Sequence, residues 1–221
     1  MVSYSHVDSI QIVNTLTSKN GTTVVTVTRE GFEKDVIKVL DSIWGSQTGG
    51  AVLRTINSMP GDIYIVPRPG NPDEAPNADA SGTGLRSDVP FEPDAWPDHP
   101  NTLSNTEVLL HELVHSVREL SGKLNQIPTN DAYEDIEEYY AIAVANVYRS
   151  ELHRVGLRGG HHSESLPPKQ RDDAAVFLST GENRKRLVKL QSENGDLFKA
   201  VSDVTNAKWN PFRLITYPGK R

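Results

Sequence analysis

The chain of 221 residues contains no cysteine. This absence excludes a disulfide framework, a cysteine-ligated zinc or iron–sulfur site and a thiol nucleophile. Basic residues are also outnumbered, because 23 lysines and arginines stand against 29 aspartates and glutamates and leave a net charge of −6. Since proteins bind phosphate groups through a basic surface, we expect no nucleic acid among the partners. Any metal site must use histidine and carboxylate side chains.

The sequence also lacks a long hydrophobic run. No apolar stretch approaches the roughly 18 residues that can span a bilayer, so no membrane span is expected. The first six residues lack the basic and apolar regions of a secretory signal. The chain is therefore expected to be cytosolic, to be exported without a cleaved signal, or to be part of a longer protein. Its length suits one ordinary domain, at most with a small extension.

Local patterns predict the elements of the N-terminal half. A β-branched run over 24–28 follows the tight-turn dipeptide Asn20-Gly21, with an apolar run over 10–13 upstream, so residues 9–28 are expected to form a hairpin. Apolar spacing predicts the next elements. These are a helix over 32–44, a second helix over 51–56 and a short buried strand over 62–66.

Residues 60–100 have a different composition, because they hold nine of the fourteen prolines. Proline disfavours both a helix and a central strand. We therefore expect a long loop with an edge strand at about 84–91. A loop of this length in a small domain is usually functional or mobile.

Two longer helices follow in the C-terminal half. The first is expected from Ser104 to about residue 120, because Ser104 and Glu107 form a capping box and Gly122 follows the end. The second is expected from about Asp131 to about Arg154, with an acidic first turn that suits the helix dipole. The apolar segments 187–190 and 197–201 fit either a hairpin or two short helices.

The first of these helices carries His111-Glu112-Leu113-Val114-His115. Four residues make about one helical turn, so both imidazoles point off one face and can bind one ion. Glu112 lies beside them, where it can take a proton from a metal-activated water and serve as general base for attack on a carbonyl. The motif is short, and a surface helix with two solvated histidines is the competing interpretation.

A catalytic zinc ion needs a third protein ligand. A third histidine is absent from the same helix, where Arg118 and Ser121 stand instead. The second helix offers carboxylates, and its Glu138–Ala141 step favours Glu138, because a small residue three positions on lets two helices approach closely. Glu137 is the alternative ligand.

A further donor commonly stabilises the developing oxyanion in zinc peptidases. Tyr133 precedes Glu138 by five residues and is one candidate. The pair His161 and His162 is another, because it follows a glycine-rich turn after the second helix. For each of these residues, a structural or merely exposed role is the alternative.

Three segments together resemble a known family. They are Leu110–His115, Glu137–Ile142 and Asn146–Arg149. They look like the NleD-type effector metallopeptidases, bacterial zincins found as type III secreted effectors and as toxin domains of Rhs and other polymorphic-toxin proteins. The resemblance covers about residues 30–160. It implies His111 and His115 as zinc ligands, Glu112 as base and the Glu138 region as third ligand.

The expected fold is α+β and zincin-like, with a small twisted sheet packed on the metal-bearing helix and on a second ligand helix. Residues 1–165 would form the metallopeptidase domain, and residues 166–221 a C-terminal extension packed on it. In zincins the substrate usually lies extended along an edge strand, which here would come from residues 62–92.

The expected function is that of a zinc-dependent endopeptidase acting on a protein of a recipient cell. The resemblance implies delivery by a specialised bacterial secretion system without a cleaved signal, followed by action in the target-cell cytoplasm. A cognate immunity protein or a secretion chaperone would be a further partner. Two alternatives stay open, namely a non-catalytic, metal-stabilised interaction module and an intracellular maturation protease.

Overall fold

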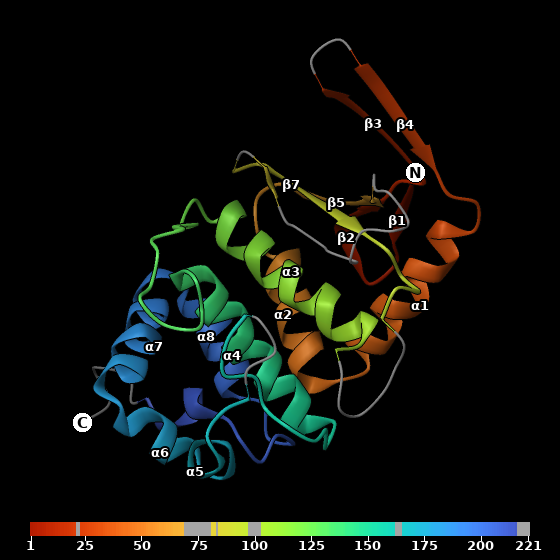
Figure 1. The fold of residues 1–221 in the computed structure, drawn as a ribbon. Helices are drawn as coiled ribbons and strands as arrows, with labels where there is room; N and C mark the ends of the chain where they lie inside the picture. The colour runs from red at the N-terminus through yellow and green to blue at the C-terminus, as the bar shows by residue number, and fades with distance from the viewer. Residues whose placement is uncertain (21–22, 69–80, 83, 97–102, 162–164, 216–221) are drawn as a thin grey trace.

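A sheet with helices gathered on one of its sides forms the body of the protein (Figure 1). The computed structural model describes residues 1–20, 23–68, 81–82, 84–96, 103–161 and 165–215. The structure is mixed α+β, as expected. Among the described residues, no helix combines the length and the apolar character needed to cross a membrane.

The sheet has five strands in the order β1-β2-β5-β7-β6. Strands β2, β5 and β7 run parallel, while β1 and β6 are antiparallel to their neighbours. Parallel pairing places Ile10 and Ile12 of β2 opposite Ile63 and Ile65 of β5, and all four are buried. The strand bounds are Val2–Tyr4 (β1), Val7–Ile12 (β2), Asp62–Pro67 (β5), Ser81–Gly82 (β6) and Arg86–Phe91 (β7).

The strands expected at 62–66 and 84–91 are both present, as β5 and β7. Strand β7 pairs with β5 along its whole length. On its other side it pairs with β6 through only two residue pairs, Ser81 with Asp88 and Gly82 with Ser87. Strand β7 is therefore nearly at the edge of the sheet.

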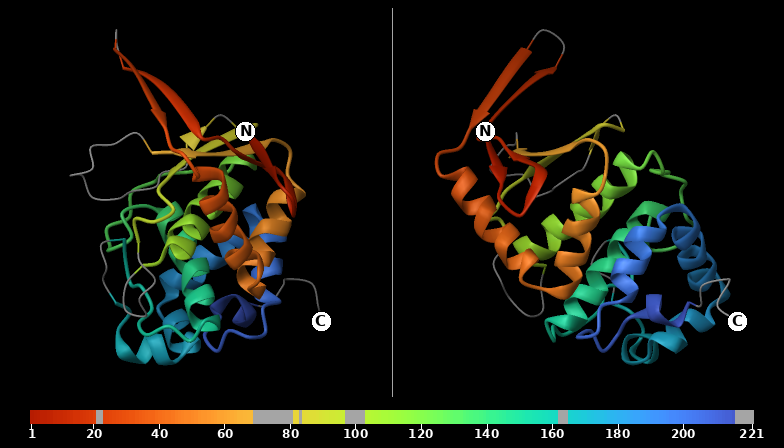
Figure 2. Two further views of the ribbon diagram at one scale, coloured as in Figure 1. Left: turned by 90° about the vertical axis from the view of Figure 1, so that its right-hand side faces the viewer. Right: turned by 180° about the vertical axis from the view of Figure 1, so that it is seen from behind.

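The prediction of a hairpin over residues 9–28 is wrong for the first strand, because residues 10–12 are not part of the hairpin. The ribbon consists of β3 (Thr15–Asn20) and β4 (Thr23–Thr28), whereas residues 10–12 belong to β2 of the main sheet. The partner of β2 is β5, which is distant in sequence, and a turn signal cannot reveal such a pairing. Figures 1 and 2 show the ribbon projecting from the body of the molecule. Gly21 of the expected turn lies outside the described residues.

Eight α-helices and one short 3-10 helix are found among the described residues. Their bounds are Phe32–Trp44 (α1), Gln47–Asn57 (α2), Asn105–Leu120 (α3), Ile136–Glu151 (α4), Pro168–Asp172 (α5), Ala174–Ser179 (α6), Gly181–Glu193 (α7), Gly195–Ser202 (α8) and Pro211–Leu214 (η1). The helix expected over 32–44 is confirmed as α1. The segments 187–190 and 197–201 are parts of two helices, α7 and α8, rather than strands of a hairpin.

Helix α2 begins four residues before the expected position 51. Its N-cap is Ser46, whose hydroxyl accepts a hydrogen bond from the Gly49 N–H at 2.8 Å. Glycine at position 49 allows α2 to lie close to the end of α1, because a Cβ there would be 2.1 Å from the carbonyl oxygen of Ile43. Glycine at position 49 is therefore required by the packing of α2 against α1.

Helix α3 has the expected ends. The Ser104 hydroxyl accepts from the Glu107 N–H at 3.3 Å. At the other end Gly122 has a φ of +64° and Lys123 donates its N–H to the Arg118 carbonyl at 2.9 Å, which is a Schellman motif. The Glu107 carboxylate differs from the expected capping box, since it pairs with Arg149 of α4 in the protein interior.

Helix α4 is shorter at both ends than expected. It begins at Ile136 because the Asp135 carboxylate caps it and accepts from the N–H groups of Glu137 and Glu138 at 2.8 and 2.9 Å. It ends at Glu151, after which His153 adopts a left-handed conformation with φ +55°. The acidic run that predicted a start near 131 thus belongs mainly to the preceding loop.

Among the C-terminal helices, α7 lies against α4 and α8 lies against α2 (Figure 1). Four large aromatic residues of the C-terminal segment are buried in the same apolar cluster as the sheet and the helices α1 to α4. These residues are Phe177, Phe198, Trp209 and Phe212. The described part of residues 166–221 therefore extends the core of residues 1–165.

Candidate metal centre

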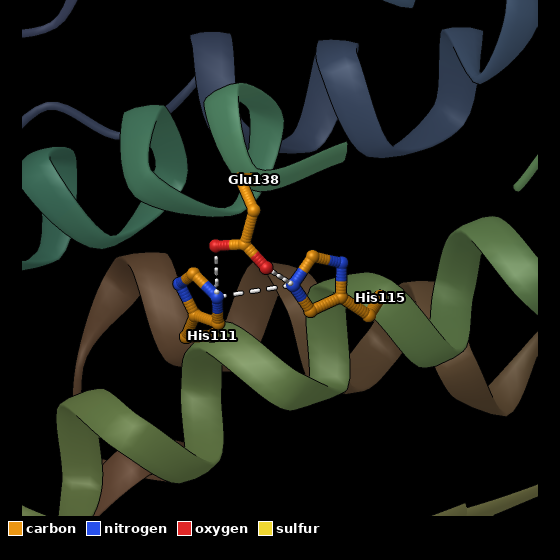
Figure 3. Close-up of side chains that lie close together, drawn as sticks. All are labelled: His111, His115 and Glu138. Atoms are coloured by element: carbon orange, nitrogen blue, oxygen red, sulfur yellow. Dashed lines mark hydrogen bonds and ion pairs between the residues drawn. The ribbon is translucent and has the colours of Figure 1, made fainter. Parts of the chain in front are cut away.

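Two helices bring the predicted ligand side chains together. His111 and His115 lie one turn apart on α3, and Glu138 lies in the first turn of α4 (Figure 3). The two Nε2 atoms are 3.0 Å apart. Nε2 of His111 is 3.1 Å from Oε2 of Glu138, and Nε2 of His115 is 3.1 Å from Oε1 of the same carboxylate. Three donor atoms from distant parts of the sequence thus form one small triangle.

This triangle fits a divalent metal ion. Ligands about 2.0–2.1 Å from a tetrahedral zinc ion lie about 3.3 Å from one another, close to the 3.0–3.1 Å found here. Two imidazoles and one carboxylate are ligands that zinc accepts, and three protein ligands leave a position open. His111 and His115 are only 6% and 8% exposed. This arrangement could therefore hold a metal whose remaining position can take water or substrate.

The shared carboxylate gives the two histidines opposite proton affinities. Burial lowers the pKa of His111 to about 4, and the hydrogen bond to Glu138 only partly opposes this. Burial also lowers the pKa of His115, but Glu138 and the charge of Glu112 outweigh it and raise that pKa to about 9. Burial raises the pKa of Glu138, yet its hydrogen bonds to both histidines keep the pKa well below the ordinary range. Since a metal needs neutral imidazoles, metal binding would release a proton.

Glu112, the predicted general base, is buried directly beside the ligands. It follows His111 in α3 and is 6% exposed. Its negative charge reaches the site, because it raises the pKa of His115. A carboxylate in this position can hold a proton close to the reacting atoms.

Glu137, the alternative third ligand, points away from the histidines. Its carboxylate accepts from Nε and Nη2 of Arg118 at 2.7 and 2.9 Å, and from the N–H of Asn125 at 2.9 Å. Arg118 is fully buried and also bonds Glu193 and Asn194 of the C-terminal segment. The two neighbouring glutamates therefore have separate surroundings, and only Glu138 meets the histidines.

The structure describes two of the three candidate oxyanion donors, His161 and Tyr133. Nε2 of His161 is 3.6 Å from Oε2 of Glu138, and its Nδ1 is 3.1 Å from Glu134. His162 lies outside the described residues. Tyr133 stacks edge-on against Tyr139 with ring centroids 5.0 Å apart, and burial raises its pKa to about 12. Of the two candidates that the structure describes, His161 is the one with a contact to a predicted ligand.

Sequence reasoning missed two residues around the site. Arg118 was noted only as a position where histidine is absent, although its spacing of three after His115 puts it on the side of α3 that meets α4. Arg158 lies in a loop whose path over α4 depends on long-range contacts. No local pattern distinguishes it from a surface arginine.

Comparisons with known proteins identify a family. The model of Peptidase_M91, described as effector protein, matches residues 20–188, which is well over half of the chain. No curated protein and no solved structure matches the chain.

Proposed function

Because the chain belongs to the Peptidase_M91 family, the NleD-like effector metallopeptidases, we propose that it is a zinc-dependent endopeptidase. We assign the zinc ligands to His111, His115 and Glu138 and the general base to Glu112. The observation that carries this proposal is the spacing of 3.0–3.1 Å among the donor atoms of the three ligands. We also propose that the fold is zincin-like. Helix α3, which carries the motif His111–His115, packs against β7, a strand that lies next to the edge of the sheet.

A zinc ion at this position would polarise the scissile carbonyl and make a bound water more acidic. Glu112 takes a proton from the attacking water and later delivers it to the leaving amine. His115 and His111 stay neutral as ligands, and Glu138 stays ionised because of its low pKa. On its outer side β7 pairs with β6 through only two residue pairs, so the rest of this side offers backbone groups to which an extended substrate can add as a strand.

Membership of an effector family indicates secretion towards a host and a protein substrate. We propose that the substrate is a protein of the recipient cell and that cleavage takes place in its cytoplasm. Export without a cleaved signal, through a specialised secretion system, belongs to the same proposal.

The test compares the wild type with Glu112→Gln and with Glu182→Gln, a matched loss of charge on the exposed face of α7. Zinc is quantified by mass spectrometry of the purified proteins. Each protein is then incubated with host-cell and bacterial extracts, and new peptide N-termini are identified. We expect bound zinc in all three proteins, with cleavage lowered by about 10²-fold or more only in Glu112→Gln.

Each alternative function gives a different result in this test. Equal cleavage by Glu112→Gln and wild type would remove the catalytic assignment. Bound zinc without cleavage in either extract would favour a non-catalytic interaction module. Cleavage confined to proteins of the producing bacterium would favour a maturation protease.

A further inference from the structure

The turn that follows α4 is fixed against that helix at Arg158. The side chain of Asn146, which is only 1% exposed, accepts from the Arg158 N–H at 2.7 Å and donates to its carbonyl at 2.8 Å. Arg158 also forms a β-bridge with Ser165. The next residue must be glycine, since a Cβ on Gly159 would lie 2.9 Å from the Ser165 backbone. The backbone of Arg158 is thus held on both sides.

The side chain of Arg158 reaches back along α4 towards the metal ligands. Asn146 is eight residues after Glu138, which is about 12 Å along the helix axis. The backbone of Arg158, which is bonded to Asn146, therefore lies at about this distance along α4 from Glu138. Its Nη2 donates to the His161 carbonyl at 3.0 Å, and the ring of His161 lies 3.6 Å from Glu138. The His161 N–H in turn bonds the Ala132 carbonyl at 2.8 Å, which ties this turn to the loop before α4.

The charge of Arg158 acts on the candidate metal centre. Burial lowers its pKa, while the charges of Glu138, Glu107 and Glu112 raise it, and the guanidinium in turn lowers the pKa of His111. Arg158 is therefore a partly desolvated cation beside the predicted ligands. Burying a charge costs free energy unless the charge is paired and hydrogen-bonded. A buried cation with few bonds within the protein is therefore a candidate for binding a ligand.

Most of its hydrogen-bonding capacity is unused within the described chain. A guanidinium has five N–H donors, and the one bond that this guanidinium makes to described residues is to His161. Arg118, only one helix turn beyond His115, spends its donors on Glu137, Glu193 and the Lys123 carbonyl. Among the described residues, Arg158 differs from this structural arginine because its guanidinium donates only to the His161 carbonyl, so most of its donors are not used by another described residue.

We propose that Arg158 is a catalytic residue that donates a hydrogen bond to the scissile carbonyl oxygen as this oxygen gains negative charge. The inference rests on the proposed peptidase function. Water adds to the carbonyl carbon, the carbonyl π electrons move to oxygen, and Glu112 takes the water proton. As the C–N bond breaks, the oxygen electrons re-form the carbonyl and Glu112 gives the proton to the amine. Arg158 stays protonated throughout, and Asn146 acts as a positioning residue.

The first test uses inorganic phosphate as an anionic probe and needs no substrate. The protein is loaded with Co²⁺, and its visible absorption is followed while phosphate is added. We expect Arg158→Gln to bind cobalt as the wild type does but to bind phosphate about tenfold more weakly, because a charge-assisted donor is lost. Arg171→Gln, an exposed arginine paired with Asp172, serves as control and should match the wild type. Equal phosphate affinity in Arg158→Gln and wild type would overturn the assignment.

The second test measures peptide cleavage once a cleavage site is known. Arg158→Gln should lower kcat by about 10²-fold with KM changed only a few-fold, the pattern of a donor needed only in the transition state. Arg158→Lys should recover part of kcat, since it keeps the charge without the planar donors. Asn146→Asp, which keeps the acceptor for the Arg158 N–H, should lower kcat less than Arg158→Gln.

Failure of this inference can be told from failure of the proposed function. If the wild type cleaves no protein, the peptidase assignment fails, and the phosphate titration still decides whether Arg158 faces the metal. If the wild type cleaves but Arg158→Gln keeps its kcat, only the inference fails. Loss of kcat in His161→Gln without loss in Arg158→Gln would move the role to His161.

Discussion

Two adjacent glutamates show how strongly the role of a residue depends on the side of the helix to which its side chain points. Glu137 and Glu138 share a helix turn and a cap, yet Glu137 neutralises the fully buried Arg118 while Glu138 meets two imidazoles. Successive residues on a helix point about 100° apart, so one of them faces α3 near its C-terminus and the other faces the histidines.

Exchange of each glutamate separates these roles. Glu138→Gln should lose most of the bound metal, because a neutral amide is a poor ligand and the carboxylate charge is gone. Glu137→Gln should keep the metal but lower the free energy of unfolding by about 3 kcal/mol, since Arg118 is left partly unpaired. Metal analysis and urea unfolding measure the two effects. Metal loss in Glu137→Gln with retention in Glu138→Gln would reassign the ligand.

Ionisation of Tyr133 is expected to lower the stability of the fold at alkaline pH. Burial raises its pKa to about 12, against about 10 for an unfolded tyrosine. Between these values the unfolded chain loses the phenolic proton and the folded chain keeps it, so stability falls as pH rises. The free energy of unfolding of Tyr133→Phe should therefore fall less steeply with pH than that of the wild type. The difference in slope should be up to about 1.4 kcal/mol per pH unit. Urea unfolding between pH 9 and 11.5 measures both slopes, and equal slopes would contradict the prediction.

At the scale of elements, one carboxylate joins the end of α4 to the start of α2. Glu151 accepts from the N–H groups of Gln47 and Thr48 at 2.6 and 2.9 Å, and from the Thr48 hydroxyl at 2.7 Å. A negative charge at a helix N-terminus satisfies free N–H groups and complements the helix dipole. Because α4 also carries Glu138, this contact helps to set where the ligand helix lies.

Glu151→Ala should lower the free energy of unfolding by about 1–2 kcal/mol, the usual effect of removing a helix cap. Metal content should stay unchanged, because the contact is at the opposite end of α4 from Glu138. Urea unfolding and metal analysis are the measurements, with the exposed Glu182→Ala as control at within about 0.5 kcal/mol of wild type. A loss of metal without a loss of stability would refute this account.

At the scale of the whole molecule, the C-terminal segment completes the core beside α3 and α4. Phe177 and Trp209 are buried in the shared apolar cluster, and Glu193 pairs with Arg118 at 2.8 Å. Residues 166–215 thus contribute to the same core as the described part of residues 1–165.

Removal of residues 166–221 should therefore abolish cooperative unfolding and metal binding. The truncated chain would expose the apolar side of α4 and leave Arg118 with fewer partners in the interior. Circular dichroism on heating and metal analysis test this, with removal of residues 216–221 alone as the control. A shortened chain of residues 1–165 that melts cooperatively with bound metal would show that the extension is dispensable.

The sequence predicted what depends on local spacing. One helical turn separates His111 from His115, and a helix capped by Ser104 places both rings on one face. The strand at 62–66 followed from an apolar run, and the edge strand at 84–91 was expected within the proline-rich stretch. The family followed from the motif segments. The metal-binding role of the triad stays a prediction.

The sequence could not predict what depends on distant partners. Residues 10–12 join β2 because β5 lies beside them, not because of the turn at Asn20. The start of α2 depends on Gly49 fitting under Ile43, and the direction of Glu137 depends on Arg118. The pairing of β2 and the direction of Glu137 are each decided by a neighbour many residues away, which no local window contains.

The buried arginine of α3 also has a consequence for the order of events in the producing cell. A chain is synthesised from its N-terminus, so His111, His115 and Glu138 are made well before Glu193 and Asn194, which complete the shell around Arg118. Until those last two residues are made, the guanidinium of Arg118 lacks part of its charge compensation, and α3 lacks these hydrogen bonds to the C-terminal segment. We therefore expect the nascent chain to acquire its metal centre late, after most of the protein already exists.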